Sequence, residues 1–288
     1  MARWTDRRAQ FRAVLNGDAC VSPASVYDPM SARLARQIGY ETGILAGSTA
    51  SMTVLGAPDH IVLTLSEFAD QAGRIGRATD LPLLVDADHG YGNALNVMRT
   101  VEELEVAGVA ALSIEDTDLP APFASGGKAS LISLEEGIGK MKAAMAAKPD
   151  PDLVVCGRTS AAQIAGAEEC RRRVAAYTEV GVDAIFLVGV PDRDCLDIVS
   201  GATDLPIVLG GAGPELKDPD YLASRNVRIR LTGHQPIAAA MNAAYETLLA
   251  LRNGTRPSDL AGLPSKDRIA AALDDDRYAG HIRDFLNG

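Results

Sequence analysis

The chain has 288 residues, of which 47% are hydrophobic and 23% are charged. This composition is typical of a globular protein and excludes a disordered or collagen-like chain. The 28 lysines and arginines and 38 acidic residues give a net charge of −10 without a local basic block, which argues against binding to nucleic acid or to an anionic membrane.

The four cysteines are widely spaced and form no CxxC pair, so the sequence predicts neither a disulfide framework nor a zinc site. The first twelve residues are charged and lack the apolar core of a secretory signal. No uncharged apolar run reaches the ~18 residues that a membrane span needs. We therefore expect a cytoplasmic protein whose cysteines act as small buried apolar residues.

Short apolar runs alternate with amphipathic segments along most of the chain. The runs predicted as strands are Ala19–Val21, Gly43–Ala46, Leu83–Val85, Ala110–Ile114, Leu153–Cys156, Ala184–Val188, Ile207–Leu209 and Val227–Leu231. The segments predicted as the helices that follow them are Pro29–Ile38, Ser66–Arg77, Val97–Ala107, Leu134–Ala147, Ala167–Val180, Asp192–Val199, Pro219–Ser224 and Pro236–Leu251. Ser66 is the expected N-cap of its helix.

These eight units predict an α/β fold, a (β/α)8 TIM-type barrel. The strands are continuous apolar runs, as expected of strands buried on both faces, and Gly39, Gly108 and Gly181 stand where helix C-caps belong. Eight units in about 250 residues fit a closed barrel. A doubly wound sheet is the alternative, but the sequence lacks the GxGxxG motif that is expected after the first strand of such a sheet.

The last part of the chain is too short to form a domain of its own. We expect residues 1–288 to form one barrel domain in which 256–288 is a C-terminal helical extension. Polar turns and one or two helices are predicted in it, at Lys266–Leu273 and Asp276–Leu286. The extension must pack on the barrel or on a neighbouring subunit.

In TIM-type barrels the active site lies at the carboxyl ends of the strands. The charged and small polar residues that follow predicted strands are Ser48, Asp86, Asp88, Glu115, Asp116, Arg158 and His234. They come from five strands, and acids predominate. These residues are therefore the candidates for the site.

Three of the acids form a candidate metal site. Asp86 and Asp88 are two positions apart, so their carboxylates point to one side of an extended segment, and Glu115 follows the adjacent strand. Converging carboxylates repel one another unless a cation balances them, and their oxygens suit Mg²⁺ or Mn²⁺. The alternative is that these acids cap helices or accept backbone hydrogen bonds.

Arg158 could hold the carboxylate of a substrate by a bidentate contact. The alternative is a structural salt bridge to Glu115 or Asp116. Gly47 and Ser48 could offer backbone amides and a hydroxyl group to an anion, or form a plain turn.

Two of the four histidines stand near these residues in the sequence. His234 follows the last predicted strand, and we expect it to be catalytic. His89 lies beside the acids, where we expect a fixed hydrogen bond to a neighbouring carboxylate.

Four motifs together resemble the isocitrate lyase/phosphoenolpyruvate mutase superfamily over about residues 18–250. They are Asp-Ala-Asp-His-Gly-Tyr-Gly-Asn at 86–93, Leu-Gly-Ala-Pro-Asp at 55–59, Ser-Ile-Glu-Asp at 113–116 and Gly-Arg-Thr at 157–159. The resemblance implies that Asp86 binds Mg²⁺ directly and that Asp88 and Glu115 hold the waters of the ion. It leaves the role of Asp59 open.

The same resemblance implies roles around an α-keto acid. Arg158, Gly47 and Ser48 match the residues that bind its carboxylate. His234 matches a histidine that faces the substrate in the oxaloacetate decarboxylase branch.

Departures from the superfamily pattern help to choose among its members. Residues 118–128 contain neither the cysteine of the isocitrate and methylisocitrate lyases nor the Lys-Thr-Asn segment of phosphonopyruvate enzymes. Residues 22–30 and Gly233-His234 most resemble the oxaloacetate decarboxylase branch. Against that branch, residues 208–213 are rich in glycine where an aromatic residue is expected.

The resemblance therefore implies a Mg²⁺-dependent lyase that converts oxaloacetate to pyruvate and CO₂ through a metal-stabilised enolate, with Mn²⁺ as a possible substitute. One alternative is a phosphonopyruvate mutase or hydrolase, or a C–C bond lyase of the same superfamily. The other is a non-catalytic barrel that binds α-keto acids. The resemblance also implies a homotetramer, a dimer of dimers, whose subunits exchange a C-terminal helix.

Overall fold

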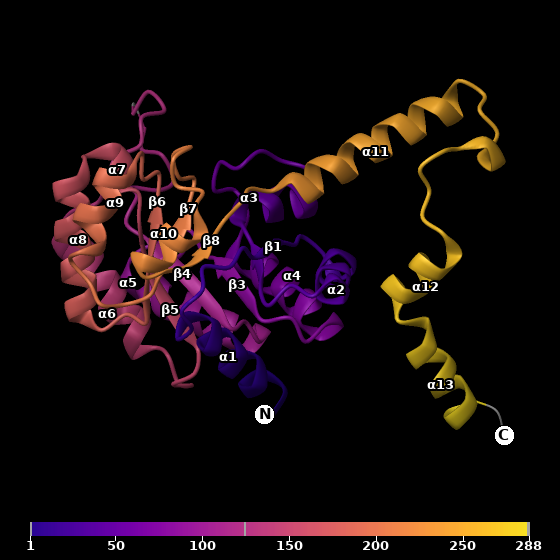
Figure 1. The fold of residues 1–288 in the computed structure, drawn as a ribbon, viewed down its shortest axis with the longest axis horizontal. Coiled ribbons are helices and arrows are strands. Elements are labelled where there is room, and N and C mark those ends of the chain that lie inside the picture. The colour runs from indigo at the N-terminus through magenta and orange to yellow at the C-terminus, as the bar shows by residue number, and fades with distance from the viewer. Residues whose placement is uncertain (1, 124, 287–288) are drawn as a thin grey trace. The chain divides into compact units, whose positions relative to one another are not determined.

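A computed structural model describes residues 2–123 and 125–286 (Figure 1). The chain forms two compact units, Met1–Gly233 and His234–Gly288. The predicted boundary of an extension at residue 256 stays a prediction. None of the helices in these described ranges is long and apolar enough to cross a membrane.

The first unit contains one sheet of eight parallel strands in the order β1 to β8. The strands are β1 (Ala24–Ser25), β2 (Gly43–Leu45), β3 (Leu83–Asp86), β4 (Ala111–Glu115), β5 (Val154–Thr159), β6 (Ala184–Val188), β7 (Ile207–Gly210) and β8 (Val227–Arg230). A parallel bridge between Val21 and Ile229 joins the segment before β1 to β8. The prediction of a TIM-type barrel is therefore confirmed.

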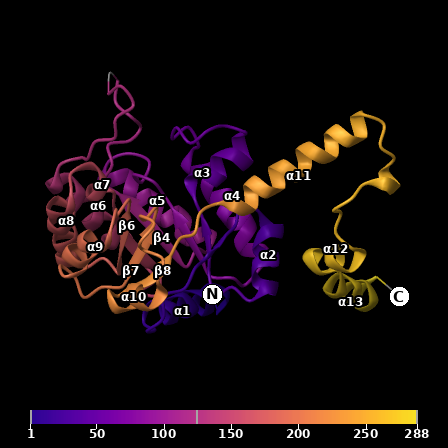
Figure 2. The same cartoon turned by 45° about the horizontal axis from the view of Figure 1, so that its top comes forward.

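Helices surround the strands (Figures 1 and 2). Those of the first unit are α1 (Ala2–Leu15), α2 (Pro29–Ile38), α3 (Gly47–Ala50), the π-helix η1 (Ser51–Leu55), α4 (Leu65–Ala78), α5 (Ala94–Ala107), α6 (Leu134–Ala146), α7 (Ala161–Ile164), α8 (Ala167–Val180), α9 (Arg193–Ser200) and α10 (Pro219–Ser224). The second unit contains α11 (Gln235–Arg252), the short 3₁₀ helix η2 (Pro257–Asp259), α12 (Lys266–Leu273) and α13 (Asp275–Phe285).

Two local predictions are wrong. The first strand is Ala24–Ser25 instead of residues 19–21, because Val21 pairs only with Ile229 of β8, whereas Ala24 begins the ladder with β2. Helix α4 is capped by Thr64 instead of Ser66. Thr64 accepts a hydrogen bond from the backbone of Glu67, whose side chain accepts one in return from the backbone of Thr64.

The sequence did not predict α1, which closes the amino-terminal end of the barrel. Phe11 and Leu15 are buried in the barrel interior against residues of the strands, among them Ile44, Leu84 and Ala111. A second cluster of buried side chains lies between the strands and the outer helices. All four cysteines are free, and three of them are buried.

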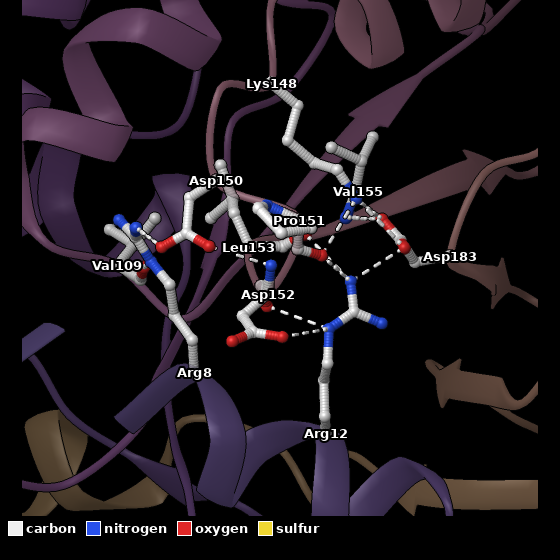
Figure 3. Close-up of polar contacts among 10 residues, drawn as sticks. All are labelled: Arg8, Arg12, Val109, Lys148, Asp150, Pro151, Asp152, Leu153, Val155 and Asp183. Atoms are coloured by element: carbon white, nitrogen blue, oxygen red, sulfur yellow. Dashed lines mark hydrogen bonds and ion pairs between the residues drawn. The ribbon is translucent and has the colours of Figure 1, made fainter. Parts of the chain in front are cut away.

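Two arginines attach α1 to the loops that precede β4, β5 and β6 (Figure 3). Arg8 donates to the carbonyl oxygen of Val109 at 3.1 Å and forms an ion pair with Asp150. Arg12 donates to the carbonyl oxygen of Asp152 at 3.0 Å and pairs with Asp183 at 2.8 Å. These bonds fix α1 at the end of the barrel opposite the carboxyl ends of the strands.

Candidate active site

Six of the seven predicted site residues lie in the first unit, at the carboxyl ends of β2 to β5. Gly47 and Ser48 begin α3 directly after β2, and Asp86 ends β3. In the sheet register Glu115, the last residue of β4, stands beside Arg158 of β5. This shared end of four adjacent strands is the reason why residues far apart in the sequence meet here.

The guanidinium of Arg158 lies between two of the acids. Its Nη1 contacts both carboxylate oxygens of Asp86, and its Nη2 lies 3.3 Å from Oε1 of Glu115. The ring of Phe186 on β6 packs 5.6 Å from the guanidinium carbon. Burial alone would lower the pKa of Arg158, but Asp86 and Glu115 raise it, so the group stays charged.

Four carboxylates, those of Asp59, Asp86, Asp88 and Glu115, share this region with the guanidinium of Arg158. Burial raises the pKa values of Asp59, Asp88 and Glu115, and the charge of Asp86 raises each of them further. Repulsion of this kind requires carboxylates close to one another. The site therefore carries an excess of negative charge in a poorly solvated place.

Asp88 reaches the acids in a way that the sequence did not indicate. The segment from Asp86 to Asp88 was expected to be extended, but Asp88 has a φ of +48°, in the left-handed region. Its carboxylate lies against Gly47, where a Cβ atom would stand 2.9 Å from both of its oxygens. Gly47 is therefore needed to leave room for Asp88, since any side chain there would displace this carboxylate.

Two hydroxyl groups orient the acids. Ser113 donates to Oδ1 of Asp86 at 3.0 Å, and Thr117 donates to Oε2 of Glu115. Neither residue was predicted. Ser113 begins the Ser-Ile-Glu-Asp motif, and its register beside Asp86 in the β3–β4 pair places its hydroxyl at this carboxylate.

Asp116 does not take part in the cluster. Its buried carboxylate accepts hydrogen bonds from Arg173 at 3.0 Å and from the hydroxyl of Tyr177 at 2.6 Å, both on α8. Arg173 also donates to the carbonyl oxygen of Ile132 at 2.9 Å, which fixes the end of the loop after β4. The alternative of an Arg158–Asp116 salt bridge is therefore wrong, whereas the Arg158–Glu115 pair is present.

Of the two histidines, only His89 is tested by the structure, and its environment differs from what was expected. Within the described ranges Nδ1 of His89 is buried without a hydrogen-bond partner, so the expected bond to a carboxylate is absent. Burial, together with Lys140, lowers the pKa of His89 to about 4, so the ring is neutral at pH 7. His234 is the N-cap residue of α11 and opens the second unit, and its place at the substrate stays a prediction.

The donor set suits a divalent cation. Carboxylate oxygens are the preferred protein ligands of Mg²⁺, which commonly takes one or two of them and keeps several waters. Among the described residues no three His, Cys, Asp or Glu side chains form a ready cage. An ion that is bound directly by one carboxylate, and by the other acids through its waters, does not need such a cage. Helix capping does not explain the acids, because Asn93 and Ser133 cap α5 and α6.

Comparison with known proteins agrees with this geometry. Residues 11–252 match the phosphoenolpyruvate phosphomutase family. A protein of Bradyrhizobium diazoefficiens named oxaloacetate decarboxylase is 55% identical over 93% of this chain and 92% of its own. Another of that name, from Bradyrhizobium sp. strain BTAi1, is 51% identical over 97% of each chain.

Solved structures of related enzymes also resemble this chain. Oxaloacetate acetylhydrolase bound to oxalate superimposes with a TM-score of 0.84, at 28% identity over 99% of each chain. Phosphonopyruvate hydrolase bound to oxalate and Mg²⁺ superimposes with a TM-score of 0.85, at 30% identity over 98% of this chain and 99% of that one. With its barrel, its acid cluster and these matches, the chain belongs to the phosphoenolpyruvate phosphomutase family, within the isocitrate lyase/phosphoenolpyruvate mutase superfamily.

Proposed function

We propose that this chain is a lyase that decarboxylates oxaloacetate to pyruvate and CO₂. The observation that carries the proposal is the cluster of Asp86, Asp88 and Glu115 around Arg158, in a chain that is 50–55% identical to proteins named oxaloacetate decarboxylase. Acids that suit a cation and an arginine that suits a carboxylate are the two features that binding of an α-keto dicarboxylic acid requires.

Mg²⁺ is the proposed cofactor, and Mn²⁺ is a possible substitute. Asp86 would bind the ion directly, and Asp88 and Glu115 would hold its waters. When bound, the ion supplies positive charge against the negative charge that develops on the carbonyl oxygen. The relative with Mg²⁺ and oxalate in its crystal structure supports this assignment.

The side chains of this chain supply binding and orientation. Arg158, Gly47 and Ser48 bind the C1 carboxylate of oxaloacetate, so that the bond to the C4 carboxylate aligns with the π system of the carbonyl group. Burial of Arg158 and of the acids keeps bulk water away and strengthens these contacts. His234 orients the C4 carboxylate and steers the proton that the enolate takes up at C3.

Pyruvate formation from oxaloacetate with Mg²⁺ tests the proposal, after the rate with Mg²⁺ alone has been subtracted. We expect a large excess over that background. Phosphonopyruvate is the second substrate to assay, because a phosphonopyruvate hydrolase is 30% identical to this chain. Turnover of phosphonopyruvate alone would replace the proposal with that activity. Oxalate binding without turnover of either acid would indicate a barrel that only binds α-keto acids.

Mg²⁺ is expected to stabilise the protein, and more at pH 8 than at pH 5. The pKa values of Asp88 and Glu115 are raised in the metal-free protein, so the fold is more stable while these two acids are protonated. This stability is lost as the pH rises through their folded-state pKa values. A cation offsets the repulsion of the ionised acids, by about 2.7 kcal/mol at 100 times its Kd. Thermal unfolding with and without Mg²⁺ at both pH values measures this effect. Equal stabilisation by NaCl of the same ionic strength would contradict a specific site.

We also propose a cytoplasmic homotetramer in which 256–288 extends a single barrel domain and a C-terminal helix is exchanged between subunits. Helix α11 has no buried residue, and Met241, Tyr245 and Leu248 on it are more than half exposed. An apolar surface of this kind suits a partner subunit. The free cysteines suit a reducing compartment. Light scattering at micromolar concentration is expected to give four times the mass of 30.2 kDa, and the mass of a monomer would contradict the proposal.

A further inference from the structure

We propose that Lys140 is a positioning residue that holds the turn between β3 and α5 in the conformation that directs Asp88 at the acid cluster. The inference rests on the proposed metal-binding role of Asp86 and Asp88. Lys140 itself lies on α6, outside the acid cluster, and acts only through the backbone of His89.

The turn needs such support because its backbone is strained. Asp88 and Tyr91 have φ values of +48° and +59°, which L-residues rarely adopt, and Gly90 and Gly92 have φ values of +78° and +149°. Backbone conformations of this kind persist only where the surrounding structure fixes them. The direction of the Asp88 carboxylate therefore depends on what holds the carbonyl groups of this turn.

Each of three successive carbonyl groups is held by a different element. The backbone N–H of Glu115 donates to the carbonyl oxygen of Asp88 at 2.8 Å. Nζ of Lys140 donates to the carbonyl oxygen of His89 at 3.0 Å, and the hydroxyl of Thr100 donates to that of Gly90 at 3.1 Å. Of these three donors only the ammonium of Lys140 is charged, and charge-assisted hydrogen bonds are the stronger ones.

The environment of Lys140 makes a purely structural role costly. The residue is 3% exposed, and among the described residues no carboxylate lies within 4.0 Å of its Nζ. Burial lowers the pKa of Lys140, while Glu136, Glu115, Asp116 and Asp118 oppose this shift from a distance. A buried ammonium without an ion pair is expensive, and an apolar residue would fill this position at a lower cost.

A cavity of about 590 Å³ is lined by Lys140 and His89, with Glu136, Asp118 and a wall of apolar residues. The cavity has room for water at the remaining protons of the ammonium group. It also has room for a larger side chain. We therefore expect an arginine at position 140 to be accommodated and to donate to the carbonyl oxygen of His89.

The test compares Lys140→Met, Lys140→Arg and the matched control Lys142→Met, which removes an exposed lysine from the same helix. Electron paramagnetic resonance measures the binding of Mn²⁺ to each purified full-length protein without substrate. We expect Lys140→Met to weaken Mn²⁺ binding by about 10- to 100-fold, the range seen when outer-shell partners of metal ligands are lost. Lys140→Arg is expected to restore the affinity to within about threefold, and Lys142→Met to leave it unchanged.

Wild-type affinity for Mn²⁺ in folded Lys140→Met would overturn the inference, as would a loss of affinity that Lys140→Arg does not restore. If Lys140→Met does not fold, Lys140→Leu, which also removes the donor, is measured in the same way and judged by the same outcomes. A wild-type protein that binds Mn²⁺ but does not release CO₂ from oxaloacetate would refute the proposed function alone. A wild-type protein that binds no Mn²⁺ would overturn the inference.

Discussion

Asp86→Asn is expected to lower the rate of oxaloacetate decarboxylation by about 10³-fold or more, to near the rate with Mg²⁺ alone. Asparagine keeps the size of the side chain but removes the charge that Arg158 contacts and the carboxylate that would bind the cation. Both the guanidinium and the ion would then lose their common partner. Pyruvate formation under saturating Mg²⁺ measures the effect.

The matched control is Asp80→Asn, because Asp80 is an exposed aspartate that pairs with the exposed Arg36. It should retain full activity. Circular dichroism must show that Asp86→Asn is folded, which we expect because Arg158 keeps its pair with Glu115. Asp86→Asn with more than a tenth of wild-type activity would show that this carboxylate is not the direct ligand of the cation.

The barrel could be predicted from the sequence because parallel strands that are buried on both faces consist of continuous apolar runs. The run predicted at 110–114 is β4 at 111–115, and the run at 227–231 is β8 at 227–230. The first strand could not be found in this way. It has only two residues, and the apolar run at 19–21 that precedes it makes a single bridge to β8.

Helix α1 was missed for a related reason. Its sequence is highly charged and has no clear apolar face, since Arg8 is buried together with Phe11. A buried arginine is stable only when other groups accept its hydrogen bonds and balance its charge. For Arg8 these groups belong to Val109, Glu105 and Asp150. Those partners are about 100 residues or more away, so no local pattern could reveal them.

The place where the candidate residues meet could be predicted, but their contacts could not. Residues that follow strands must meet at one end of a parallel barrel, which was enough to find Asp86, Glu115 and Arg158. Which acid Arg158 would contact depends on the strand register and on competing cations. From the sequence, Asp116 was as suitable a partner for Arg158 as Glu115. In the structure Arg173, 57 residues later on α8, binds Asp116 instead.

Phe11→Ala is expected to lower the free energy of unfolding by about 3–5 kcal/mol, the usual effect of truncating a buried phenylalanine. Phe11 is 0% exposed and packs in the barrel interior with residues of several strands. These strands belong to a closed sheet and cannot move inward to fill the cavity. Urea unfolding followed by circular dichroism measures the change.

Phe123 offers the matched control because its side chain is fully exposed in the loop after β4. Phe123→Ala should change the free energy of unfolding by no more than about 0.5 kcal/mol. Phe11→Ala should keep its activity at 25 °C, because α1 closes the end of the barrel opposite the site and the strand ends that carry Asp86 and Arg158 are not touched. A loss below about 1 kcal/mol would contradict the packing of α1 into the barrel, whereas a loss of activity in the folded variant would show that the two ends are coupled through the strands.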